Sequence, residues 1–136
     1  MKIYFSGSIK GGREDKEIYF EIINILKKYG EILTEYVGDQ NLSSYGQKNF
    51  TDEQIYEKDT QWLKIADVIV AEVTTPSLGV GYEIAFAESL GKKILCLYRE
   101  NGSKSLSSMI KGDKNLDVKT YKEVKDLEIV FQEFFK

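Results

Sequence analysis

Hydrophobic residues form short apolar runs along this chain, separated by longer stretches in which apolar positions recur every three or four residues. Short apolar runs are typical of buried strands, and the periodic stretches are typical of amphipathic helices. The runs predict five strands, the last of them weakly patterned: Lys2–Phe5, Ile32–Val37, Val68–Val73, Ile94–Tyr98 and Asp117–Tyr121. The periodic stretches predict four helices, at Glu14–Tyr29, Asp52–Ala66, Gly79–Leu90 and from Lys122 to the C-terminus. Gly30 and Gly91 follow two of these helices and are expected to end them.

Strands that alternate with helices predict a parallel sheet with helices on both faces. Five such strands favour a flavodoxin-like, doubly wound α/β fold with strand order 2-1-3-4-5, formed by a single domain over residues 1–136. Ligands of such folds bind at the carboxyl ends of the strands, where the strand order reverses, so chemistry is expected just after Phe5 and Val73. Two polar stretches, Gly38–Asn49 and Glu100–Ser105, are predicted loops, and the first is long enough to suggest a lid or disorder.

Composition narrows the possible functions. The 136 residues carry a net charge of −3, which argues against a nucleic-acid partner, since such proteins usually show a basic stripe. No apolar run approaches the roughly 20 residues of a membrane span, and no targeting segment is visible, so a cytoplasmic protein is expected. The chain has one cysteine, Cys96, and no histidine. These counts exclude internal disulfides, serine–histidine and cysteine–histidine nucleophiles, and histidine-rich metal sites.

A glycine-containing loop, Ser6–Arg13, lies between the first predicted strand and the first helix. Its sequence, SGSIKGGR, has the spacing of neither a Walker A loop nor a dinucleotide-binding loop. Glycines allow close approach of an anion, and the following helix N-terminus offers free N–H groups. The alternative is a tight turn that needs glycine only for its backbone geometry.

A second candidate segment, Pro76–Glu83, follows the third strand. Gly79 and Gly81 allow a close approach there, and Ser77 is a hydrogen-bond donor. Glu83 shares a helical stripe with Gly79 and Ala87 and is expected to point inward. The alternative is a carboxylate placed near a helix N-terminus because it interacts favourably with the helix dipole.

Asp59 lies on the apolar stripe of the second helix, between Ile55 and Leu63, so it is expected to be either paired or functional. Two inward carboxylates at one sheet edge suit cleavage of a glycosidic bond, with one as acid and the other as nucleophile or base. Tyr4 is then a possible partner for Glu83, or else an ordinary strand aromatic. Other residues are given structural interpretations: Trp62 in the core, Cys96 as an inert buried thiol, and Glu72 facing solvent.

The segment Tyr4–Asp15 resembles the opening of the 2′-deoxynucleoside 5′-phosphate N-hydrolases, which are related to the nucleoside 2-deoxyribosyltransferases. The resemblance extends to about Gly112. It includes three further blocks, Glu57–Leu63, Ala66–Glu83 and Ile94–Arg99, and the segment Leu106–Ile110.

The resemblance implies hydrolysis of the N-glycosidic bond of 2′-deoxynucleoside 5′-monophosphates, with no metal or organic cofactor. It assigns Glu83 as nucleophile, Asp59 as acid and Tyr4 as the residue that positions the nucleophile. Residues implied to bind the 5′-phosphate are Ser8, Lys10, Ser77, Gly79 and Ser107. Residues implied to lie beside the base and sugar are Ile9, Tyr36 and Met109.

In the family, the serine equivalent to Ser107 reaches the site from a partner subunit, which implies a homodimer. Two positions differ from the family pattern: Lys10 replaces a frequent arginine, and Tyr36 replaces a histidine. Two other functions stay open from the residues alone, a deoxyribosyltransferase that passes the sugar to a second base and a non-catalytic nucleotide-binding module.

Overall fold

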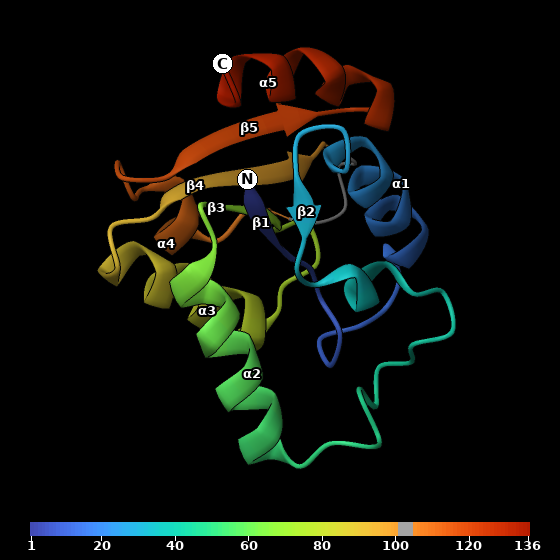
Figure 1. The fold of residues 1–136 in the computed structure, drawn as a ribbon. Coiled ribbons are helices and arrows are strands. Elements are labelled where there is room, and N and C mark those ends of the chain that lie inside the picture. Colours follow the sequence, from blue (N-terminus) through green and yellow to red (C-terminus); the bar gives the residue numbers. More distant parts are fainter. Residues whose placement is uncertain (101–104) are drawn as a thin grey trace.

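The computed structural model describes residues 1–100 and 105–136, and its centre is a parallel five-stranded sheet. The strand order β2-β1-β3-β4-β5 confirms the flavodoxin-like α/β prediction (Figure 1). The strands are β1 (Lys2–Ser6), β2 (Glu31–Ile32), β3 (Val68–Glu72), β4 (Lys93–Arg99) and β5 (Asp117–Tyr121). Strand order reverses at β1, which pairs with β2 on one side and with β3 on the other. The carboxyl ends of β1 and β3 are therefore the expected place for a ligand.

Helices cover both faces of the sheet (Figure 1). The described helices are α1 (Lys16–Leu26), α2 (Asp52–Ile65), α3 (Leu78–Ser89), the short α4 (Ser108–Lys111) and α5 (Leu127–Phe134). The side chains of α1 and α5 join one buried cluster, and those of α2 and α3 join another on the opposite face. No helix in the described part of the chain is both long and apolar enough to cross a bilayer.

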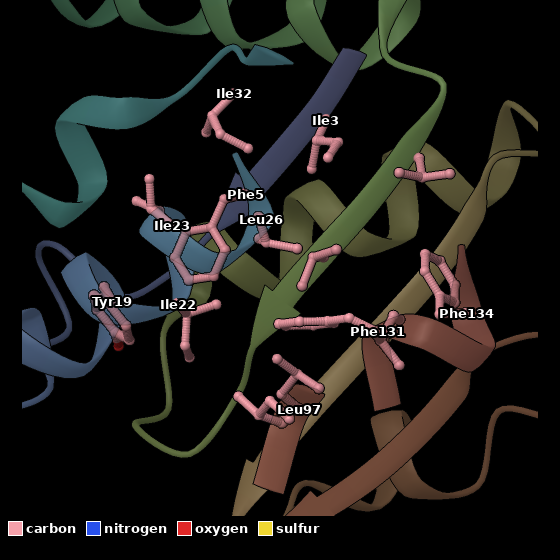
Figure 2. Packing of buried hydrophobic residues seen from close by; sticks show 14 of the residues in the cluster. Ile3, Phe5, Tyr19, Ile22, Ile23, Leu26, Ile32, Leu97, Phe131 and Phe134 are labelled. Atoms are coloured by element: carbon pink, nitrogen blue, oxygen red, sulfur yellow. The ribbon is translucent and has the colours of Figure 1, made fainter. Parts of the chain in front are cut away.

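Alternation along β1 directs neighbouring residues to opposite faces of the sheet. Ile3 and Phe5 pack with the α1 and α5 cluster, where Phe131 also lies (Figure 2). Tyr4 points to the other face and packs with Ile69 and Ile84. This alternation places the phenol of Tyr4 on the same side of the sheet as α3.

The predicted strand Ile32–Val37 is wrong beyond its first residue. Leu33 still donates its N–H to the Ile3 carbonyl, but at Thr34 the side chain replaces the backbone. Its Oγ1 accepts from the Phe5 N–H at 2.9 Å and donates to the Phe5 carbonyl at 2.6 Å. The chain then turns into a 3₁₀ helix, η1 (Glu35–Gly38), which no sequence pattern predicted.

The ends of two helices also differ from the prediction. α1 ends at Leu26 and not at Gly30, which has no positive φ. Gly30 is needed for space instead, because a Cβ there would lie 2.4 Å from the Met1 carbonyl oxygen. At the C-terminus, a 3₁₀ helix, η2 (Val124–Asp126), precedes α5, so the last helix begins five residues later than predicted.

The two predicted loops have different outcomes. Most of Gly38–Asn49 lacks helix and strand and makes a wide excursion before α2 (Figure 1). Of the second loop, residues 101–104 lie outside the described residues, whereas α4, which begins shortly after it, was not predicted.

Candidate active site

A cavity of about 980 Å³ opens where β1 and β3 end. Its walls come from the loop after β1, the Gly38–Asn49 loop, α2, the segment from Val73 into α3, and residues 106–116. Both segments that the sequence singled out therefore border one space. The fold predicts this position, since β1 and β3 flank the point of strand reversal.

Glu83 lines this cavity, and both of its carboxylate oxygens accept hydrogen bonds. The phenol of Tyr4 donates a hydrogen bond to Oε2, and Ser6 Oγ donates to Oε1 at 3.2 Å. Burial raises the pKa of Glu83 to about 8. The expected contact between Tyr4 and Glu83 is present, and Ser6 is a further partner that the sequence analysis did not single out.

The start of α3 explains how Glu83 reaches this position. Ser77 caps the helix, since its Oγ accepts from the Val80 N–H at 3.4 Å. Glu83 follows between one and two turns later and points into the cavity. A Cβ added to Gly81 would meet no atom within 4 Å, and one on Gly79 only Ser77 Oγ at 3.9 Å. The backbone at these glycines therefore faces open space, which a ligand can approach closely.

Asp59 lines the same cavity from α2. The hydroxyl of Tyr36 lies 3.2 Å from both Asp59 carboxylate oxygens and donates to them. Burial raises the pKa of Asp59, while Lys58 and the Tyr36 hydrogen bond act in the opposite direction. Burial and the adjacent carboxylate together raise the pKa of the Tyr36 phenol. The residue that departs from the family pattern is thus in contact with the predicted acid.

The residues proposed for a phosphate do not all reach the cavity. Lys10, Ser77, Gly79 and Ser107 line it, although Lys10 is exposed and lies 3.9 Å from Asp52. Ser8 does not line it. Its side chain is fully buried, and its Oγ has no hydrogen-bond partner among the described residues.

Gly11 allows the loop after β1 to pass closely over the loop after β3. A Cβ at Gly11 would lie 2.6 Å from the Pro76 carbonyl oxygen and 2.9 Å from Ser8 Oγ. Arg13, the other cation of this loop, is absent from the cavity wall. Its guanidinium donates to three backbone carbonyls, those of Ser8, Asp39 and Leu42.

The residues predicted beside a base and sugar all line the cavity: Ile9, Tyr36 and Met109. Met109, on α4, is 81% exposed and so lies at the rim. Trp62 is half-buried, and its ring centroid lies 6.3 Å from that of Tyr36. Cys96 is buried as predicted, and burial raises the pKa of its thiol to about 12.

The solvent-facing interpretation of Glu72 is wrong. This residue ends β3 and is fully buried. It accepts hydrogen bonds from the Tyr121 phenol and, at 2.7 Å, from the Thr74 N–H. Beside it, Arg99 forms an ion pair with Asp15 at 2.8 Å. Strand periodicity cannot reveal this cluster, because residues distant in sequence supply the polar partners.

The described side chains that line the cavity offer carboxylates, hydroxyls, the phenol of Tyr36, the amide of Gln47 and the ammonium of Lys10. Within residues 1–100 and 105–136, no group of three or more histidines, cysteines, aspartates and glutamates is arranged to hold a metal ion. The cavity therefore holds one carboxylate that accepts from two donors and a second that contacts a phenol, and a pair of carboxylates is what cleavage of a glycosidic bond requires.

Comparisons with known proteins find relatives that match this chain over its whole length. The chain is 50% identical over 141 residues to 5-hydroxymethyl-dUMP N-hydrolase of Esox lucius, an alignment that covers 100% of this chain and 97% of the relative. It is 48% identical to the Danio rerio protein of the same name, with 100% and 96% covered. The solved structure of Clostridium botulinum CMP N-glycosidase, BcmB, shares the fold with a TM-score of 0.66 at 20% identity, covering 97% of this chain and 99% of that one. The sequence model of the family described as nucleoside 2-deoxyribosyltransferase matches residues 3–126, and the chain belongs to that family.

Proposed function

We propose that this protein hydrolyses the N-glycosidic bond of 2′-deoxynucleoside 5′-monophosphates to a free base and 2-deoxyribose 5-phosphate. The names of the Esox lucius and Danio rerio relatives agree with the N-hydrolase predicted from the sequence. The observation on which the proposal rests is the carboxylate of Glu83, held by Tyr4 and Ser6 in a cavity that Asp59 also lines.

In the proposed mechanism, Glu83 attacks the anomeric carbon of the deoxyribose as the C–N bond breaks. Asp59 gives a proton to the departing base, and the sugar is left as an ester on Glu83. Water then attacks the same carbon, Asp59 takes its proton, and Glu83 is released as a carboxylate. The donors Tyr4 and Ser6 hold both oxygens of Glu83 and so fix the direction of attack. No metal or organic cofactor takes part.

The 5′-phosphate is proposed to bind at the start of α3. Ser77 and the open backbone at Gly79 line the cavity there, and Lys10 lines it from the loop after β1. The unpartnered hydroxyl of Ser8 lies outside the cavity wall but close to Gly11, which itself lies beside Pro76 and Ser77. A dianion suits such donors, because hydrogen bonds to charged acceptors are about twice as strong as those to neutral ones.

A homodimer with Ser107 contributed in trans is part of the proposal. Apolar side chains at the cavity rim support it, since Leu78 is 97% and Met109 81% exposed. Such side chains are typical of a surface that another protein covers. Mixing Ser107→Ala with an excess of Glu83→Ala tests the arrangement, because a mixed dimer then contains one intact site. A KM of the mixture equal to that of the wild type supports contribution in trans. A KM equal to that of Ser107→Ala alone shows that Ser107 serves its own subunit.

A cytoplasmic location is also proposed. The single cysteine, Cys96, is a free buried thiol, so the fold does not depend on an oxidising compartment. Fractionation of cells that express the tagged protein tests this location.

Incubation of the pure protein with each deoxynucleotide, followed by measurement of free base, tests the function. Release by the wild type and none by Glu83→Ala, which should still bind nucleotide, is the expected result. Added methanol should give the methyl deoxyriboside phosphate with retained configuration, and an inverted product would remove the covalent step. Base exchange without hydrolysis would identify a transferase, and binding without release a nucleotide-binding module.

A further inference from the structure

The Gly38–Asn49 loop forms part of the cavity wall and is tied to the loop after β1. Arg13 makes the connection, since its guanidinium donates to the Ser8 carbonyl at 3.0 Å and to those of Asp39 and Leu42 at 2.9 and 3.0 Å. One side chain therefore joins the loop beneath the proposed phosphate site to the loop that faces it. The long loop is held in place by these bonds even though it contains little regular structure.

Gln47 is brought to the cavity by a turn at Gly46. Gly46 has φ +83°, in the region that favours glycine, and a Cβ there would lie 3.4 Å from Lys10 Cε and 3.9 Å from Ile9 Cγ2. The turn thus packs against the loop after β1, and both Gly46 and Gln47 line the cavity. The position of Gln47 is therefore set by the backbone, not only by its own side chain.

Lys58 determines which end of the Gln47 amide is available. Its Nζ donates to Gln47 Oε1 at 3.1 Å. The same Nζ lies 4.8, 4.5 and 5.2 Å from the ring centroids of Tyr36, Phe50 and Trp62. An ammonium has only donors, so it can pair with the carbonyl end of the amide but not with the NH₂ end. The NH₂ group of Gln47 is left without this partner beside the cavity.

Gln47 lies on the side of the cavity from which the base would leave. Lys58 immediately precedes Asp59 on α2. The ring face of Tyr36 contacts Lys58, and its hydroxyl contacts Asp59. Asp59 is the proposed acid for the departing base, whereas the proposed phosphate site lies at Ser77. A group bound near Gln47, Tyr36 and Asp59 is therefore the base and not the phosphate.

We propose that Gln47 is a specificity-determining residue whose amide NH₂ donates a hydrogen bond to a carbonyl oxygen of the base, and that Lys58 is the positioning residue that orients this amide. The inference rests on the proposed function. It predicts a preference for bases with an exocyclic carbonyl over those with an amino group at the same position. An amino group on the base is a donor and cannot accept a hydrogen bond from the NH₂ group of Gln47.

The pair dUMP and dCMP tests the proposal, since these substrates differ at position 4, where one has a carbonyl and the other an amino group. The wild type should show the higher kcat/KM for dUMP. Gln47→Leu should lower the dUMP-to-dCMP ratio about tenfold, the effect expected for one hydrogen bond to a buried polar group. Gln47→Glu should lower it further, because its second oxygen accepts from the amino group of dCMP.

Variants of Lys58 separate orientation from general damage. Lys58→Met allows the Gln47 amide to rotate, so that either end can face the base, and should lower the dUMP-to-dCMP ratio. Lys58→Arg keeps a donor to Gln47 Oε1 and should keep the ratio of the wild type. Lys48→Met is the matched control, because Lys48 is an exposed cation next to Gln47 for which no hydrogen bond or ion pair with a described residue is found. Its ratio should equal that of the wild type.

A wild-type ratio retained in both Gln47→Leu and Lys58→Met would overturn this inference while base release continues. Absence of base release from every deoxynucleotide would instead contradict the proposed function. Calorimetric titration of Glu83→Ala with dUMP and dCMP measures the preference in binding without turnover, and equal affinities for the two nucleotides would overturn the role of Gln47.

Discussion

The phenol of Tyr4 in β1 donates a hydrogen bond to Oε2 of Glu83 in α3, although the two residues are 79 positions apart in the sequence. The contact forms because strand alternation directs Tyr4 to the face that α3 covers. It matters for the proposed reaction because a nucleophilic carboxylate needs both a fixed direction and a suitable pKa. Burial works against ionisation of Glu83 and the Tyr4 hydrogen bond works for it.

Tyr4→Phe should therefore reduce activity through the pKa of Glu83. The proposed reaction needs Glu83 ionised and Asp59 protonated, so the two carboxyl groups must share one proton. With the pKa of Glu83 at about 8, kcat/KM should fall above about pH 8, where this proton is lost. Loss of the phenol should lower kcat/KM at pH 7 about tenfold. It should also move the alkaline fall in kcat/KM to higher pH. A lower kcat/KM whose alkaline fall stays at the same pH would mean that Tyr4 acts through packing and not through the pKa of Glu83.

Asp59→Asn should reverse the dependence of kcat/KM on pH in the alkaline range. Without Asp59 no shared proton is needed, and the remaining reaction depends only on the ionisation of Glu83. The residual kcat/KM should then rise with pH through about 8 instead of falling. Slowing should be greatest for bases that leave poorly, since a general acid matters least for good leaving groups. Uniform slowing across bases of different basicity would make Asp59 an orienting residue.

The phosphate site should distinguish nucleotides from nucleosides. Ser77→Ala removes a hydroxyl at the start of α3, while the backbone donors of the helix stay. The KM for deoxynucleoside monophosphates should rise by roughly tenfold, as expected for a hydrogen bond to a charged group. The slow rate on the corresponding nucleoside should hardly change, and inorganic phosphate should compete weakly. Equal rates on deoxyguanosine and dGMP would contradict a phosphate site and favour the transferase.

Much of this fold and site follows from sequence periodicity and from loop positions in a parallel sheet. The strand order, the cavity at the ends of β1 and β3, and the inward Glu83 agree with prediction. What periodicity missed depends on side chains that replace backbone contacts, as Thr34 does where β2 ends. It also missed polar pairs across long sequence distances, such as Lys58 with Gln47 and Tyr121 with Glu72. An apolar pattern identifies buried positions but gives no information about the partner of a buried polar group.

Tyr121→Phe tests the importance of one such pair for the loop that carries Ser77. Glu72 ends β3 just before this loop, and its carboxylate accepts from the Tyr121 phenol and the Thr74 N–H. Burial raises the pKa of Glu72, while both hydrogen bonds lower it. The raised pKa means that folding favours the protonated form, so this group reduces the free energy of unfolding as pH rises above its unfolded pKa. Removal of the phenol raises the pKa of Glu72 further and makes this loss larger.

Urea unfolding of the wild type and Tyr121→Phe at pH 5 and pH 8 measures the effect. The variant should be less stable by about 1–3 kcal/mol at pH 8, and the difference should be smaller at pH 5, because the raised pKa of Glu72 favours uptake of a proton, and so loss of the buried charge, as pH falls. Tyr45→Phe is the control, because Tyr45 is 82% exposed and surface changes usually alter stability by less than about 0.5 kcal/mol. A difference that does not depend on pH would show that Tyr121 stabilises the fold through packing and not through the carboxylate of Glu72.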